Sequence, residues 1–218
     1  MLPDSPVSFR ILLMATTAYA LTSLQRVKDR LGLTSAGFDP LLERLINAST
    51  DLIESHCDRR FKEATYANEL YLVEADGARM VMLKQAPVTA LTSLQYRAGV
   101  PTIPSWTDFL PVEFELVGDG TSGLIRIYGG VPRGTNNIQA SYTAGYKIDF
   151  THDTDLTKHT LPFDLSDLCE RITIKAFKKR ESVGKSREQA GEAMAMWMEA
   201  LEPEEQLSLD RYRRVYLG

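Results

Sequence analysis

Apolar residues recur at helical spacing in two segments near the start of the chain. In the first segment, residues 24–31, four side chains share one face: Leu24, Val27, Lys28 and Leu31. Thr22 and Ser23 precede this segment, and Gln25 follows Thr22 by three residues, which is the spacing of a capping box. Gly32 comes next and can end a helix. The pattern therefore predicts a short amphipathic helix over 24–31.

The second segment begins at Asp39-Pro40, an acidic N-cap followed by the residue favoured at the first helical position. Its apolar stripe recurs at spacings of three and four: Leu41, Leu42, Leu45, Ile46, Ser49, Leu52, Ile53 and His56. The run ends in Cys57-Asp58, and Arg60 and Phe61 follow. We expect Phe61 to lie in the core. We expect the Arg60 guanidinium to meet a carboxylate or the carbonyls of a helix end.

The middle of the chain is rich in β-forming residues separated by turns. The short runs with this texture are residues 66–73, 79–83, 91–97, 114–117, 124–128 and 138–142. Residues 98–111 contain Gly99 and three prolines, so we expect a loop there, with Trp106 and Phe109 folded back onto the body. The pattern predicts an antiparallel meander of about five strands over 62–146.

The last third returns to helical spacing after a polar stretch, residues 147–160, that we expect to be a mobile surface loop. Pro162 opens a helix with one apolar face: Leu165, Leu168, Cys169, Ile172, Ala176 and Phe177. A break near Gly184 precedes a second helical stretch over 187–201, and Pro203 follows it. Residues 202–218 form a tail that should be flexible until it is bound.

These elements predict an α+β fold built as a single domain. Helices occupy residues 21–61, the antiparallel β-meander 62–146, further helices 161–201 and the tail 202–218. Residues 7–13 read as a strand in an N-terminal arm, 1–20, and residues 11–20 are apolar. The alternative is a cleaved signal peptide over 11–20, since Ala18-Tyr19-Ala20 has the shape of a cleavage site. That alternative would make the protein a secreted binding domain. Against it, the flanking residues are poor in basic side chains.

Composition is that of an ordinary globular protein, with 218 residues, 44% hydrophobic and 25% charged. A net charge of −4 argues against general attraction to nucleic acid. Two cysteines far apart, Cys57 and Cys169, are expected as free thiols of a reducing cytoplasm. No apolar run approaches the ~20 residues that cross a bilayer, so no membrane partner is expected.

The sequence contains only weak candidates for a nucleotide-binding, metal-binding or catalytic site. Gly184-Lys185-Ser186 resembles the end of a phosphate-binding loop, but the first glycine of that motif is missing. His152 and His159 share a loop with two aspartates and could form a weak metal cluster, although solvated side chains fit the spacing better. No nucleophile elbow is present. We therefore expect no enzyme, with no catalytic, metal or cofactor residues.

Charge is segregated along the C-terminal third. Basic residues dominate from Arg171 to Arg187, and acids dominate from Glu188 to Asp210. The two blocks could neutralise each other within one subunit, or meet between neighbouring subunits of a ring. The basic block could also lie beside DNA. The candidate subunit-interface residues are Lys175, Lys178, Lys179, Arg180, Lys185, Arg187, Glu188, Glu192 and Trp197. Trp197 belongs to a methionine-rich run, 193–198, that suits either an interface or core packing.

Several motifs in order resemble the head–tail connector (adaptor) proteins of tailed bacteriophages. They are LTSL at 21–24, VKDRL at 27–31, LLERLINA at 41–48 with IE at 53–54 and RF at 60–61, YTAGY at 142–146, LPFDL at 161–165, and Arg180 to Gly184. The resemblance implies a structural neck protein of the virion, made in the bacterial host cytoplasm. It implies a homo-oligomeric ring, a dodecamer, beneath the portal protein that continues the DNA channel and offers a platform to the next neck or tail protein.

The tail combines arginines with aromatic and apolar residues, the types enriched at binding hot spots. The resembled family docks its C-terminal segment on the portal, which marks these residues as candidates for portal binding: Arg211, Tyr212, Arg213, Arg214, Tyr216 and Leu217. The alternative is a helix folded back on its own subunit through Leu207, Tyr212 and Val215. The competing function is a sequence-independent nucleic-acid-binding module that uses the basic stripe from Arg171 to Arg187.

Overall fold

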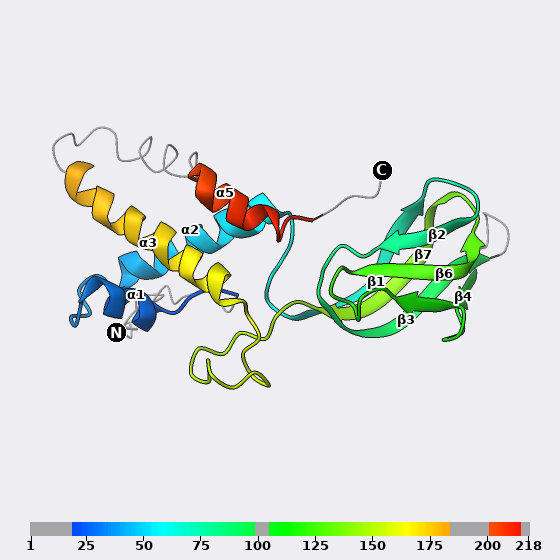
Figure 1. Ribbon diagram of the computed structural model, residues 1–218, viewed down its shortest axis with the longest axis horizontal. Helices are drawn as coiled ribbons and strands as arrows, with labels where there is room; N and C mark the ends of the chain where they lie inside the picture. The colour runs from blue at the N-terminus through cyan, green and yellow to red at the C-terminus, as the bar shows by residue number, and fades with distance from the viewer. Residues whose placement is uncertain (1–18, 99–104, 184–200, 215–218) are drawn as a thin grey trace, which may run out of the picture.

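A body of helices lies at one end of the molecule and a body of strands at the other, in the computed structural model of the chain (Figure 1). The structure describes residues 19–98, 105–183 and 201–214. The predicted strand at 7–13 and the predicted helix over 187–201 lie outside these residues. We call the two parts the helical body and the β-body.

The first helix, α1 (Leu24–Leu31), begins and ends where the pattern predicts. Its N-cap is Ser23, whose side chain accepts from the Arg26 amide at 3.3 Å. The capping box built on Thr22 and Gln25 is wrong. The Thr22 hydroxyl donates to Glu170 instead, and the Gln25 amide donates to Asp29. The partner of Thr22 is distant in the sequence, whereas the partner of Gln25 lies one helical turn further along α1.

The second helix, α2 (Asp39–Cys57), has Phe38 as its N-cap, one residue before the predicted Asp39. The Asp39 carboxylate instead lies 2.8 Å from Lys28 Nζ and so ties α1 to α2. The buried face of α2 keeps Leu42, Ile46, Ser49 and Ile53 of the predicted stripe. It also includes Thr50, Glu54 and Cys57. Asp58 ends the helix at φ 50°.

The C-terminal helices α3 (Phe163–Val183) and α5 (Pro203–Asp210) pack with α2 in the helical body (Figure 1). On α3, Leu165, Leu168, Cys169 and Phe177 are buried, which confirms the predicted face at those positions. The side chains divide between two apolar clusters. One of them joins Ile53 and Phe61 to the start of α3 and to Leu209 of α5.

The β-body contains two antiparallel sheets packed around one core. The first has the strand order β1 (Ala64–Val73), β7 (Gly134–Ala144), β3 (Val88–Ala98) and β4 (Ser105–Asp108). The second has the order β2 (Ala78–Met82), β6 (Leu124–Val131) and β5 (Phe114–Leu116). The α+β class with central antiparallel strands is confirmed. Strands that are consecutive in the sequence do not always pair: β1, for example, pairs with the last strand, β7.

The predicted loop over 98–111 is partly wrong, because β4 lies within it and pairs with β3. Trp106 faces Arg97 in that register. Phe109 does fold back as expected, with its ring centroid 4.9 Å from that of Tyr96. The three prolines of this segment lie outside β4, which leaves its backbone free to pair.

Two crossing chain segments join the helical body to the β-body. The Tyr146 amide donates to the Phe61 carbonyl at 2.7 Å, and the Glu63 amide donates to the Tyr146 carbonyl at 2.8 Å. Gly145 sits between them at φ 111°, where a Cβ would lie 2.7 Å from the Lys62 carbonyl. Phe61 is fully buried at this crossing, which confirms its predicted place in the core. No helix within the described ranges is long and apolar enough to cross a membrane.

Candidate assembly surfaces

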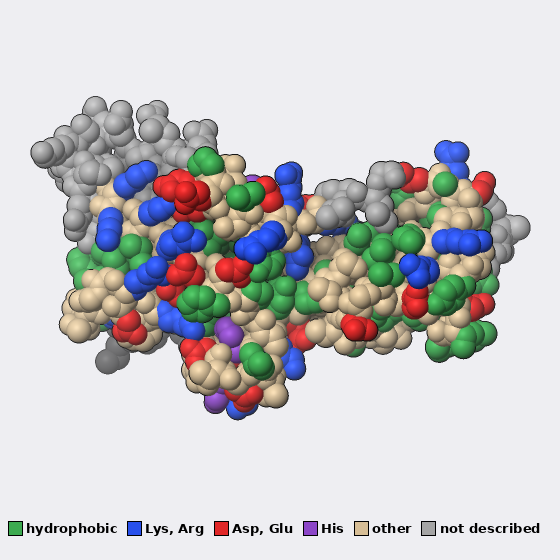
Figure 2. All heavy atoms as spheres, viewed as in Figure 1, with side chains coloured by type: hydrophobic (Ala, Val, Ile, Leu, Met, Phe, Trp, Pro, Cys, Tyr) green, Lys and Arg blue, Asp and Glu red, His purple; other side chains and the backbone are tan. Residues whose placement is uncertain are grey.

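The basic stripe on α3 is partly neutralised within the subunit. Lys175 Nζ lies 2.9 Å from Glu202 and also contacts Glu205 of α5. Arg171 lies 3.0 Å from Asp167, one turn earlier on the same helix. Figure 2 shows basic and acidic side chains interspersed over the helical body on the face drawn. Lys175 therefore pairs with the acidic block of its own subunit, whereas Arg171 pairs with an acid outside that block.

Beyond Lys175 the candidate interface residues are placed unevenly. Lys178 and Lys179 are exposed on α3, and Arg180 continues the same helix. The remaining candidates lie outside the described residues: Lys185, Arg187, Glu188, Glu192 and Trp197. Among the described candidates, Lys178 and Lys179 are therefore accessible, whereas Lys175 is held by the glutamates of the C-terminal segment.

The C-terminal segment, residues 201–214, folds back on its own helical body. Leu209 is fully buried, and the ring of Tyr212 meets the edge of Phe61 at 6.1 Å between centroids. The Arg214 amide donates to the Cys57 carbonyl at 2.9 Å. The expectation of a flexible tail is therefore wrong for residues 203–214. The alternative prediction, a segment folded back on its own subunit, is right for Tyr212. It is wrong for Leu207, which is 72% exposed.

The candidate portal-binding residues fall into two groups. Tyr212 and Arg214 hold the segment in place; Arg214 also lies 3.8 Å from Asp58. Arg211 and Arg213 are exposed, and Arg211 reaches Asp164 at 3.3 Å. Tyr216 and Leu217 lie outside the described residues. The accessible positive charge of the segment thus comes from Arg211 and Arg213.

Arg59 connects the C-terminal segment with both bodies. Its guanidinium donates to the Tyr212 carbonyl at 3.3 Å and to the Ala86 carbonyl of the β-body. It also lies over the Phe61 ring, 5.1 Å from the centroid. Sequence reasoning missed Arg59 because its carbonyl partners are distant in the chain and leave no local pattern.

Arg60 behaves as the sequence predicts. It contacts the carboxylate of Glu54, whose side chain is 4% exposed and which also accepts from the Phe61 amide at 3.0 Å. Burial raises the pKa of Glu54, while the Phe61 amide and Arg60 lower it. Glu54, Arg60 and Phe61 are the spaced residues of the IE…RF motif, so this motif fixes the exit of the chain from α2.

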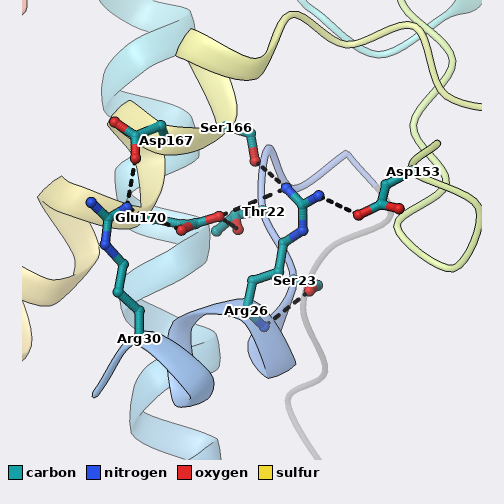
Figure 3. Close-up of polar contacts among 8 residues, drawn as sticks. All are labelled: Thr22, Ser23, Arg26, Arg30, Asp153, Ser166, Asp167 and Glu170. Atoms are coloured by element: carbon teal, nitrogen blue, oxygen red, sulfur yellow. Dashed lines mark hydrogen bonds and ion pairs between the residues drawn. The ribbon is translucent and has the colours of Figure 1, made fainter. Parts of the chain in front are cut away.

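A second polar cluster holds α1 against α3 (Figure 3). Arg26 lies 2.6 Å from Asp153, and its other terminal nitrogen donates to Ser166 at 3.0 Å. Arg30 reaches Asp167 at 2.6 Å and Glu170 at 3.2 Å. The sequence analysis did not single out these arginines. Their i, i+4 spacing on the polar face of α1 was the available signal.

Asp153 ties the polar loop over 147–160 to α1, and His159 makes a contact within the loop itself. His159 is 7% exposed, and its Nδ1 accepts from the Asp149 amide at 3.1 Å. Its pKa is lowered, chiefly by burial and then by the nearby Arg26. Within residues 19–98, 105–183 and 201–214, no three metal-binding side chains converge. Burial raises the pKa of both thiols, Cys57 and Cys169, to about 12.

Comparison with known proteins agrees with this architecture. The family model described as "Head completion protein" matches residues 20–215. None of the curated proteins matches the sequence. A chain in the neck of an empty gene transfer agent particle, computed with C6 symmetry, has the same fold at 20% identity and a TM-score of 0.52, over 94% of this chain and 96% of that one. A chain from the virion of a native gene transfer agent particle matches at 19% identity and a TM-score of 0.49, over 89% and 90%.

The matched family spans the helical body, the β-body and the C-terminal segment together. The motif resemblance to head–tail connector proteins is confirmed at this level. This chain belongs to the head completion protein family.

Proposed function

We propose that the protein is a neck component of a tailed phage or phage-like particle, forming a ring beneath the portal that joins head to tail. The observation that carries this proposal is the family match over residues 20–215. The shared fold with a chain from the neck of a gene transfer agent particle supports the location. The role is mechanical: the ring holds partners together and continues the DNA channel.

We propose a ring of twelve subunits. A particle neck computed with C6 symmetry accommodates a dodecamer with two chains per symmetry unit. Lys178, Lys179 and Arg180 are proposed to contact the neighbouring subunit, since all three lie in the last two turns of α3 and the side chains of Lys178 and Lys179 are exposed. Lys185, Arg187, Glu188, Glu192 and Trp197 remain candidates for the same contact.

The portal contact is proposed for the C-terminal segment. Because residues 203–214 are already docked, Arg211 and Arg213 would present their charge from a pre-ordered surface, which lowers the entropic cost of binding. Tyr212 and Arg214 would act by positioning that surface. Tyr216 and Leu217 would extend it. The next neck or tail protein would bind the opposite side of the ring.

The competing nucleic-acid-binding role is disfavoured by specific contacts. A phosphate-binding stripe needs uncompensated lysines and arginines. Lys175 is instead held by two glutamates, and Arg171 by Asp167. DNA in the channel would therefore pass along the wall of the ring, and it would not be the primary ligand of the subunit.

A null mutant of the phage or prophage tests the proposed function. We expect cells that lack this protein to accumulate DNA-filled heads and separate tails that do not join, and expression of the protein in trans should restore whole particles. Thin-section and negative-stain electron microscopy distinguish the two populations. Normal numbers of tailed particles in the null mutant would overturn the proposal.

A further inference from the structure

Arg59 carries a positive charge that is not paired with any carboxylate of the described ranges. Its side chain is partly buried just after α2, and burial lowers the pKa of its guanidinium. The guanidinium donates instead to two main-chain carbonyls, those of Ala86 and Tyr212, and it lies over the Phe61 ring. The Tyr146 side chain also hydrogen-bonds to it. A partly buried charge that depends on neutral acceptors is destabilised when one of them is withdrawn.

The two carbonyls belong to different parts of the molecule. Ala86 lies in the connection between β2 and β3, residues 83–87, and so belongs to the β-body. Tyr212 lies in the turn that follows α5. Figure 1 shows the end of this C-terminal segment close to the crossing chain segments that join the two bodies. The Arg59 side chain therefore bonds the C-terminal segment and the β-body at the same time.

The β2–β3 connection is where the chain leaving α2 holds the β-body. The Arg60 amide donates to the Gln85 side chain at 2.9 Å, and the Arg59 guanidinium donates to the Ala86 carbonyl. The two crossing segments are single chains between structural elements, and residues in such places are typical hinges. Contacts at the β2–β3 connection therefore restrict the angle between the helical body and the β-body.

The C-terminal segment is the part of this arrangement most able to open. The helix α5 has eight residues, too few to be stable in isolation, so its structure depends on docking. Its anchor is Leu209, which is fully buried and whose carbonyl accepts from the Cys57 thiol at 3.7 Å. Opening of the segment would uncover Cys57 and withdraw the Tyr212 carbonyl from Arg59.

We propose that docking of the C-terminal segment and the orientation of the β-body are coupled through Arg59. While the segment is docked, both carbonyls hold Arg59, and Arg59 holds the β2–β3 connection. When the segment opens, Arg59 loses the Tyr212 carbonyl, and the β-body is no longer kept in one orientation. Such a coupling is reciprocal, so loss of the contact with Ala86 should also favour opening of the segment.

The coupling is a property of the single subunit and does not depend on the proposed ring. Combined with the proposed portal contact, it has one consequence. A portal bound to Arg211 and Arg213 would hold the C-terminal segment down and would thereby fix the orientation of the β-body. This consequence rests on the proposed function, whereas the coupling itself does not.

Modification of Cys57 in the full-length protein measures opening of the segment. The reaction with N-ethylmaleimide, located by peptide mass spectrometry, reports how often the fully buried thiol is uncovered. Arg59→Met removes the charge and its hydrogen bonds, so it should raise the rate at Cys57 by about tenfold or more. Arg133→Met, at an exposed arginine of the β-body, is the matched control and should react like the parent.

The direction of the change distinguishes opening from a direct effect of charge on the thiol. The charge of Arg59 lowers the pKa of Cys57, although burial raises it more. Loss of that charge alone would therefore leave less thiolate and slow the reaction. A faster reaction in Arg59→Met reports opening of the segment.

Two further observations separate opening of the segment from a general loss of stability. Cys169 is fully buried and should stay unmodified in every variant. Arg59→Lys keeps the charge but lacks the planar fork that reaches two carbonyls, so it should raise the rate at Cys57 by less than Arg59→Met does. Equal reactivity of Cys57 and Cys169 in both variants would show global unfolding and overturn the proposal. A parental rate at Cys57 in Arg59→Met would also overturn it.

The distance between the two bodies provides the direct test of coupling. Spin labels are placed at Arg44→Cys of α2 and Arg79→Cys of β2, both exposed positions, in a Cys57→Ser background. Pulsed dipolar spectroscopy of the labelled chain, diluted with unlabelled protein, then gives the distribution of distances between the helical body and the β-body. The parent should give a narrow distribution, and Arg59→Met a broader one.

A second substitution opens the segment without changing Arg59. Leu209→Ala removes the buried anchor of α5, so it should broaden the distribution in the parent background. It should add little in the Arg59→Met background, because the link is already lost there. An unaltered distribution in Leu209→Ala, or an equal further broadening on top of Arg59→Met, would overturn the proposal. Either result concerns the single subunit and would leave the proposed ring and neck role intact.

Discussion

The hydroxyl of Tyr212 lies 2.8 Å from both carboxylate oxygens of Asp164 and donates to that carboxylate. This contact joins the turn after α5 to the first turn of α3. The Tyr212 ring packs against Phe61 on its other side, where the two bodies meet. Tyr212 therefore fixes the C-terminal segment against the junction between the helical body and the β-body.

The variant Tyr212→Phe should lower the free energy of unfolding by about 1–2 kcal/mol, because a half-buried hydrogen bond to a carboxylate is lost while the ring still packs. Urea denaturation followed by circular dichroism measures this difference. Tyr128→Phe is the matched control, because it removes a tyrosine hydroxyl that bonds Glu115 at an exposed position of β6, and it should lower stability less than Tyr212→Phe does. If the two variants behaved alike, the C-terminal segment would be held by packing alone.

The junction predicts a second contrast, between two phenylalanines. Phe61→Ala removes a fully buried ring and should cost about 3–5 kcal/mol of stability. Phe163→Ala removes a ring that is 75% exposed at the start of α3 and should change stability by less than about 0.5 kcal/mol. Thermal melts of the two variants compare them directly. Similar melting temperatures for Phe61→Ala and the parent would mean that the crossing of the two bodies is placed wrongly.

Local signals in the sequence predicted the elements well. Gly32 ends α1 and Pro40 lies in the first turn of α2, because the backbone preferences of glycine and proline do not depend on distant residues. The motif that contains Glu54 and Arg60 was placed correctly for the same reason. Glu54 lies in the last turn of α2 and Arg60 follows directly after the helix, so the two residues are close in the sequence.

Long-range partners could not be predicted from the same patterns. Nothing near Thr22 indicates that its hydroxyl meets Glu170, and nothing near β1 indicates that it pairs with β7. The fate of the C-terminal segment also depended on distant residues. Its composition suits an interface as well as a docked helix. For residues 203–214, hydrogen bonds to the Cys57 carbonyl and the Asp164 carboxylate hold the segment on its own subunit.

His159 should make stability depend on pH in the acidic range. Its pKa is lowered by burial and by Arg26, although Asp153 and Asp149 raise it in part. The unfolded chain therefore binds a proton more readily than the folded one. Stability should fall as the pH drops from neutrality through the ordinary histidine value of about 6.5.

The variant His159→Asn keeps an acceptor near the Asp149 amide and removes the titrating group. We expect its melting temperature to fall less than that of the parent between about pH 7 and pH 5. Melting curves at a series of pH values measure the difference. An equal or larger fall in the variant would show that His159 is not the group responsible.

Reversal of charge at the end of α3 tests the proposed subunit contact there. The triple variant Lys178→Glu, Lys179→Glu, Arg180→Glu should need a roughly tenfold higher concentration to assemble at low salt, since exposed pairs contribute about 0–1 kcal/mol each.

The subunit itself should stay folded after this reversal, as judged by circular dichroism. The control Lys147→Glu, Lys158→Glu reverses charge on the polar loop and should assemble like the parent. Unchanged assembly of the triple variant would remove α3 from the interface.

We propose that this chain forms a ring on the portal of a tailed particle. Negative-stain electron microscopy of the purified full-length protein, alone and mixed with its portal protein, tests it most directly. We predict annular particles with a central channel that stack coaxially on the portal, with twelve copies of the chain per ring. A protein that stays a single subunit in both samples and leaves the portal bare would contradict the claim.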